Sequence, residues 1–224
     1  ASLAGTAPAM AEDSFTPAME AYREGRFSDA LLIAKPLAEQ GNVPAQLMLG
    51  SIYNNGEGVT PDTDEAARWF ALAAAKGDAS AQYALGMMHE YGGVSEAKPE
   101  EARRLFTAAA EQGHVASQAE LGMMYASGRG GAQDLAQAAS WFERAAEKGN
   151  ANGQYYLGTL YAAGRGKPEN YAEAARLFTL AADQGHAQAN YQLGLMLQDG
   201  IGVQKNQAGA ITQPVGHGGE HFLL

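Results

Sequence analysis

A Leu-Gly pair returns five times along the chain at a constant interval of 36 residues. The five copies are Leu49-Gly50, Leu85-Gly86, Leu121-Gly122, Leu157-Gly158 and Leu193-Gly194. Two further glycine series keep the same interval, one beginning at Gly41 and the other at Gly56. A fixed period of this length is typical of repeat proteins, in which each repeat is one small unit of secondary structure. The interval therefore predicts a chain of similar stacked units.

Each period has the pattern of two helices. In the first repeat we expect them at residues 43–55 and 62–76, because apolar and small side chains recur there at helical spacing. Gly56 and Gly58 fall between the two helices and predict a turn. A single hairpin of this kind cannot bury its apolar face alone, so neighbouring units must stack.

Gly50 lies inside the first predicted helix, where glycine costs about 1 kcal/mol relative to alanine. Because glycine returns at this place in every copy, we expect a bulky side chain to approach the helix closely there. The candidate is the Trp-Phe or Leu-Phe pair of the second helix, which is Trp69-Phe70 in the first repeat. Gln46 recurs in phase as well, and its amide is expected to bind neighbouring backbone.

The repeating sequence resembles that of a known family. It reads Ala-x-Ala-Gln-x-x-Leu-Gly-x-x-Tyr, then Gly-x-Gly, then Glu-Ala-x-x-Trp-Phe-x-x-Ala-Ala-x-x-Gly. This pattern is similar to the Sel-one-like repeat (SLR) family, a relative of the tetratricopeptide repeats, over residues 42–203, with four complete repeats and a partial fifth. The resemblance implies an all-α fold, an α-α superhelix or solenoid of helix-turn-helix repeats with a concave inner wall. The second repeat departs from the pattern, with Gly92-Gly93-Val94 at its turn.

The segment before the repeats divides into two parts. Residues 15–41 predict a degenerate hairpin that caps the solenoid, because terminal repeats have a neighbour on one side only. Residues 1–14 are expected to be a flexible leader and a signal-peptide remnant, since Ala9-Met10-Ala11 has the small-x-small form of a signal peptidase site. We therefore expect a periplasmic or secreted protein, and a cytoplasmic one if no export signal precedes this segment.

Residues 204–224 are predicted to form an irregular tail. Gly209 and Pro214 fall where the fifth repeat should continue its second helix, and proline breaks helices. The uncovered end of the stack is then a candidate surface for a homo-oligomer.

The tail also contains His217-Gly218-Gly219-Glu220-His221, which matches the order of a zinc peptidase motif. Its two glycines disfavour a helix and no third ligand is evident, so we expect no metal and no cofactor.

Composition excludes several classes of partner. The chain has 25 acidic and 15 basic residues, a formal charge of −10, which disfavours nucleic acid. No apolar run approaches the roughly 18 to 20 residues that a membrane-spanning helix needs, so no membrane insertion is expected. The absence of cysteine removes disulfides and thiolate metal sites.

The positions that vary between repeats are the candidates for a working surface. On the first helix of each repeat they lie about 200° from the apolar position of Ala45, and by the family resemblance they line the concave wall. In the later repeats the candidate groove residues are Tyr83, Met87 and Glu90, then Met123, then Tyr155 and Thr159, then Tyr191, Leu195 and Gln198. Tyrosine and methionine are typical anchors at protein interfaces. The competing interpretation is that neighbouring side chains cover these positions.

Three histidines and the carboxylates have structural interpretations. His114 and His186 stand where other repeats have Asn42, Asp78 and Asn150, which predicts helix caps. His89 replaces a recurring tyrosine and is expected to pack in the core. Recurring glutamates begin the second helices, where they complement the helix dipole, and we expect no catalytic residues.

The function expected from these features is a non-enzymatic interaction scaffold, an adaptor or regulator that holds a protein or peptide in its groove. The resemblance to the SLR family implies the expected partners, because some exported members of that family restrain a membrane sensor kinase and others support envelope assemblies. The alternative is a β-lactam-binding or hydrolysing enzyme, which some cysteine-rich relatives are linked to. That subgroup's disulfides are absent here.

Overall fold

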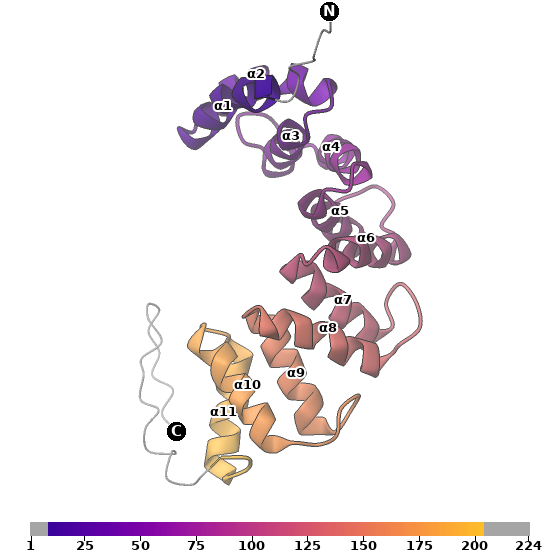
Figure 1. Cartoon of the computed structure of the whole chain (residues 1–224), viewed down its shortest axis with the longest axis vertical. Coiled ribbons are helices and arrows are strands. Elements are labelled where there is room, and N and C mark those ends of the chain that lie inside the picture. The colour runs from indigo at the N-terminus through magenta and orange to yellow at the C-terminus, as the bar shows by residue number, and fades with distance from the viewer. Residues whose placement is uncertain (1–8, 204–224) are drawn as a thin grey trace, which may run out of the picture. The chain divides into compact units, whose positions relative to one another are not determined.

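The computed structural model describes residues 9–203, with side chains from residue 14 onward, and this part of the chain is all-α (Figure 1). Its eleven helices are α1 Ala9–Arg23, α2 Phe27–Glu39, α3 Val43–Asn55, α4 Thr63–Ala75, α5 Ala79–Tyr91, α6 Pro99–Glu111, α7 Val115–Ser127, α8 Leu135–Glu147, α9 Ala151–Ala163, α10 Tyr171–Asp183 and α11 Ala187–Asp199. Within the described range, each helix is too short or too polar to span a bilayer.

The predicted two-helix repeat is confirmed. The expected helices at residues 43–55 and 62–76 correspond to α3 and α4, with Asp62 and Lys76 as the caps of α4. Gly56 and Gly58 adopt φ angles of 70° and 72°, a left-handed conformation that glycine enters without steric cost. The helices pack on their neighbours in chain order within two compact units, α1–α6 and α7–α11.

Helix starts are fixed by side chains that accept hydrogen bonds from backbone N–H groups, which have no partner within the helix. The Asn42 side chain accepts a hydrogen bond from the Ala45 N–H at 2.9 Å, and Asn150 does the same for Gly153 at 2.8 Å. His186 accepts the Ala189 N–H through Nδ1 at 3.2 Å, so its predicted capping role is confirmed. Each such cap typically contributes about 1 kcal/mol to stability.

The glycine inside the first helix of each of the four complete repeats receives a phenylalanine, as its recurrence predicted. A Cβ atom added to Gly50 would lie 2.5 Å from the ring of Phe70. The same contact occurs between Gly122 and Phe142 at 2.6 Å. The second residue of the Trp-Phe or Leu-Phe pair therefore makes the contact, and every other side chain would be too large for the glycine position.

The recurring glutamine binds backbone across the junction between repeats, which confirms the prediction. Gln46 Nε2 donates to the Ala38 carbonyl oxygen at 3.0 Å. Gln154 makes the equivalent bond to the Ala146 carbonyl at 3.5 Å, and its own Oε1 accepts from Gln184 Nε2 at 2.7 Å. The amide thus joins the helices before and after it.

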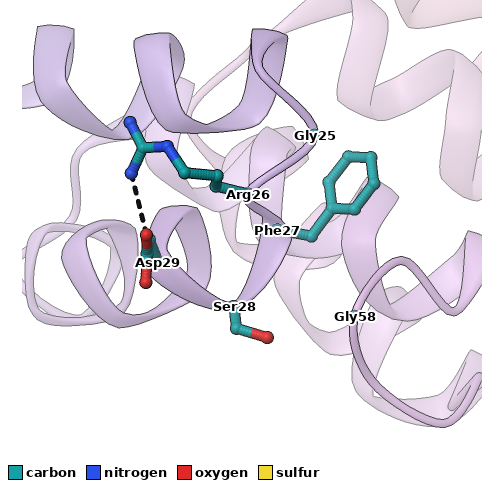
Figure 2. Close-up of a pocket in the computed structure, with 6 residues that line it drawn as sticks. All are labelled: Gly25, Arg26, Phe27, Ser28, Asp29 and Gly58. Atoms are coloured by element: carbon teal, nitrogen blue, oxygen red, sulfur yellow. Dashed lines mark hydrogen bonds and ion pairs between the residues drawn. The ribbon is translucent and has the colours of Figure 1, made fainter.

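The N-terminal hairpin consists of α1 and α2. Helix α1 begins at Ala9, inside the segment expected to be a flexible leader, so the predicted boundary at residue 14 does not coincide with a helix end. Figure 2 shows a shallow pocket at the α1–α2 turn, where Arg26 bonds Asp29 at 2.8 Å and the ring of Phe27 points away from that pair. The loop at Gly58 lies against Phe27, because a Cβ on Gly58 would be 2.9 Å from the Phe27 Cβ.

The predicted tail at residues 204–224 lies outside the described residues. This holds for Gly209 and Pro214 and for the His217-to-Glu220-to-His221 motif as well.

Candidate binding surface

The predicted groove residues lie on four helices in two units. Helix α5 of the first unit carries Tyr83, Met87 and Glu90. The second unit carries Met123 on α7, Tyr155 and Thr159 on α9, and Tyr191, Leu195 and Gln198 on α11. They do not share one environment, because some of them pack against the next repeat.

In the first unit the predicted residues are largely covered. The ring of Tyr83 lies 4.8 Å from that of His114 and 5.9 Å from that of Phe106, measured between centroids. Met87 is half-buried. Glu90 is only 8% exposed, so the expectation that its position faces solvent is wrong. A helical wheel gives the direction of a side chain but not what lies beyond it.

On α9, Tyr155 belongs to the junction between the fourth and fifth repeats. Its ring lies 4.6 Å from the ring of His186, the residue that caps α11, and 5.8 Å from that of Phe178. Thr159 is exposed, and its hydroxyl donates to the Tyr155 carbonyl oxygen at 3.0 Å. Met123, on α7, is half-buried. Tyr155 therefore has a packing partner in the next repeat.

On α11 the predicted residues face solvent. Tyr191 is 66% exposed, Leu195 is 38% exposed and Gln198 is exposed. Their spacing of four and three residues places them on one side of the helix. The opposite side of α11 packs Ala189, Leu193 and Met196 into the core. We call Tyr191, Leu195 and Gln198 the α11 face.

A pocket of about 410 Å³ that was not predicted from the sequence lies between α8, α9 and α10. Its walls include Glu143 and Glu147 of α8, which stand where the first repeat has alanines. These changes between repeats were visible in the sequence. They lie on the second helix of the repeat, whereas the predicted groove residues all lie on the first helices.

The chain also contains a Ser-x-x-Lys sequence, the nucleophile motif of some β-lactam hydrolases, at Ser95-Glu96-Ala97-Lys98, which is not among the predicted sites. Ser95 Oγ hydrogen-bonds the Asp64 carboxylate at 2.9 Å, and Lys98 Nζ pairs with Glu96 at 2.8 Å. Both side chains lie in the exposed loop before α6, and each is bonded to a carboxylate. This arrangement does not direct the lysine amine at the serine hydroxyl.

The described residues contain no cluster of three metal-ligating side chains. His89, predicted to pack in the core, is half-buried, and its Nδ1 atom is buried.

Three glutamates at the starts of second helices each pair with an arginine one turn later: Glu65 with Arg68, Glu101 with Arg104 and Glu173 with Arg176. The hydrogen bond from the arginine lowers the pKa of each glutamate, so all three are ionised at neutral pH.

Solved structures share this architecture. A protective antigen of uropathogenic Escherichia coli strains with an SLR fold is 33% identical, with a TM-score of 0.79 over 85% of this chain. A Sel1 repeat protein from Oxalobacter formigenes is 28% identical, with the same TM-score and the same coverage. The chain spans 42% of the length of the first structure and 76% of the second. An immunity protein from Pseudomonas aeruginosa shares the fold at 20% identity, with a TM-score of 0.52. The match covers 85% of this chain and 72% of the immunity protein.

Comparison with curated proteins gives no match. The family model described as Sel1 repeat, in contrast, matches in five consecutive segments, at residues 43–78, 79–114, 115–150, 151–186 and 187–211. These segments join without gaps and have the period of the Leu-Gly pairs. Together with the helix pairs and the Gly-Phe contacts, they show that this chain belongs to the Sel1 repeat family.

Proposed function

We propose that the chain is a protein-binding scaffold that holds a segment of a partner protein on the α11 face. The observation that carries this proposal is the exposure of Tyr191 and Leu195 on one side of α11. The recurring positions of the repeat are packed inside, whereas these variable positions present an aromatic ring and an aliphatic side chain to solvent. Such side chains bury a large area when a partner covers them.

We place a second, smaller contact on α9 of the same unit. Thr159 is exposed on α9, and Tyr155 packs against the same core cluster as Leu193 of α11. Met123, on α7 of the same unit, is half-buried and would contribute only the edge of its side chain. We therefore assign the main contact to α11 and a smaller one to α7 and α9.

The partner we propose is a protein or peptide of the cell envelope, such as a membrane sensor kinase or an envelope assembly, and the chain would act there as an adaptor. The support is the sequence Ala9-Met10-Ala11, whose form suits export. The excess of acidic residues favours partner segments without strong negative charge.

A peptide selection tests the proposal. Random peptides displayed on phage are selected on the immobilised chain, and the affinity of a synthetic copy is measured by fluorescence anisotropy. We expect Tyr191→Ser combined with Leu195→Ser to weaken binding at least about 10-fold, since truncating interface anchors typically costs 1 to 2 kcal/mol or more. The matched control is Leu32→Ser, which removes a 74% exposed leucine from α2.

Equal affinity of the double variant and the wild type would refute the α11 assignment. A dimer mass in light scattering of the chain alone, lowered to a monomer mass by the same double variant, would assign the face to a second copy instead.

A further inference from the structure

We propose that the pocket between α8, α9 and α10 binds the side chain of a lysine or arginine in a partner segment. This site is separate from the α11 face and does not depend on it. The pocket has a volume of about 410 Å³, within the range of roughly 300 to 1,000 Å³ that is usual for ligand sites. Three features of its walls indicate the chemistry of the occupant.

The first feature is an apolar floor. Leu157 and Leu177 are only 4% and 2% exposed and belong to the core of the second unit, so the pocket reaches down to that core. Leu180, on α10, is 38% exposed at its edge. An aliphatic stem of three or four methylenes would gain by covering these side chains, because lysine and arginine bury their stems on apolar surface and keep the charged end in water.

The second feature is an excess of negative charge above this floor. Three carboxylates line the pocket, on Glu143, Glu147 and Glu173, against the single guanidinium of Arg176. Glu173 is paired with Arg176 at 2.6 Å, and Glu143 is paired with Lys167 at 2.6 Å. Within residues 14–203, Glu147 makes neither an ion pair nor a side-chain hydrogen bond. A cation on the partner would supply the missing counter-charge.

The third feature is that the repeat does not require these carboxylates. The packing residues recur two repeats earlier, where Leu85, Leu105, Glu101 and Arg104 stand for Leu157, Leu177, Glu173 and Arg176. The positions of Glu143 and Glu147 are occupied there by Ala71 and Ala75. Stacking therefore accounts for the floor and for the Glu-Arg pair but not for the two acidic residues of α8. An acidic residue returns at the position of Glu147 as Glu111 and Asp183 in the neighbouring repeats, whereas Glu143 stands where the other repeats have Ala71, Thr107 and Thr179, so Glu143 is the addition particular to this pocket.

These features together select the occupant. An apolar floor beneath an uncompensated carboxylate suits a cation carried on an aliphatic stem. A nucleic-acid backbone would be repelled by the same carboxylates. The pocket thus favours a basic side chain on a partner protein.

An NMR titration tests the proposal on the full chain. The probe is the peptide acetyl-Ala-Ala-Leu-Lys-Leu-Ala-Ala-amide, added to isotope-labelled protein at low salt, and its matched control carries norleucine in place of lysine. We expect amide shifts at Glu147, Leu157 and Leu180 with the lysine peptide only. Glu147→Gln should weaken this binding at least about 5-fold, because it removes the unpaired charge and keeps the shape of the side chain.

The control variant is Glu20→Gln, which removes an exposed carboxylate from α1, far along the chain from the pocket, and should leave the affinity unchanged. Equal shifts with the norleucine peptide, or equal affinity of Glu147→Gln and wild type, would overturn the proposal. Shifts confined to α11 would overturn it too, while leaving the protein-binding function in place.

Discussion

At the scale of single residues, the absence of one methyl group determines how each repeat packs. The ring of Phe142 lies where a Cβ of Gly122 would be, and the other complete repeats make the same contact. Gly194, in α11, has no described atom within 4 Å of its own added Cβ. Among the residues that the structure describes, the glycine is therefore required by packing in α7 but has no such packing partner in α11.

This difference gives a prediction for a matched pair of variants. Gly122→Ala and Gly194→Ala gain the same helix propensity, about 1 kcal/mol, but only Gly122→Ala forces a methyl group into a phenylalanine ring. Overpacking of this kind typically costs about 1 to 3 kcal/mol. We expect urea unfolding followed by circular dichroism to show Gly122→Ala less stable than Gly194→Ala by that amount. Equal stabilities would mean that the Gly-Phe contact is not tight in solution.

The sequence was sufficient for some residues and not for others. It predicted the contact at Gly50 because a helical glycine that recurs needs a steric reason, and the backbone bond of Gln46 because a recurring amide needs a partner. It failed at Glu90, since a helix pattern contains no information on which neighbouring segment covers a side chain. The pocket beside Glu147 was missed because it forms among three helices of two repeats.

At the scale of helices, two junctions between repeats contain a contact between a tyrosine and a histidine ring. The Tyr83 ring is tilted by 39° against that of His114, and Tyr155 stacks on His186, the cap of α11, each pair being 31 residues apart. At the other two junctions Leu47 is followed at the same distance by Asp78, and Ala119 by Asn150. Histidine therefore replaces the ordinary cap residue where the preceding helix offers a tyrosine ring. The junctions of this chain are built in two alternative ways.

The histidine junction predicts a dependence of stability on pH. Burial lowers the pKa of His114 below its usual value of 6.5, and the nearby Asp78 opposes that shift only in part. Because the folded state disfavours the proton, His114 stabilises the fold above pH 6.5. This contribution is lost as the pH falls through the lowered folded pKa.

We expect His114→Asn, which installs the residue of the Asn42 cap, to lose less stability than wild type between pH 7.5 and pH 5. The measurement is thermal unfolding of both proteins at both pH values. The paired carboxylates also titrate, but they are the same in both proteins and cancel in the comparison. An identical loss in the two proteins would show that protonation of His114 does not weaken the junction.

At the scale of the whole molecule, the fold follows from the period because nearly all contacts of a repeat are made with its neighbours in the chain. The helix bounds of one repeat, once assigned at residues 43–55, could be copied 36 residues onward four times, and α5, α7, α9 and α11 confirm them. Function does not follow in the same way, since it belongs to side chains that differ between copies. Tyr191 and Glu143 lie at such positions, where other repeats have Leu47 or Ala119 and Ala71 or Thr107.

The central claim, that repeated positions build the scaffold and the α11 face binds a partner, is tested most directly by photo-crosslinking. Tyr191→benzoylphenylalanine and, as the control, Leu32→benzoylphenylalanine are irradiated with the selected peptide, and the products are mapped by mass spectrometry. We predict a covalent adduct at position 191 and none at position 32. Adducts of equal yield at both positions, or an adduct at position 32 only, would contradict the claim.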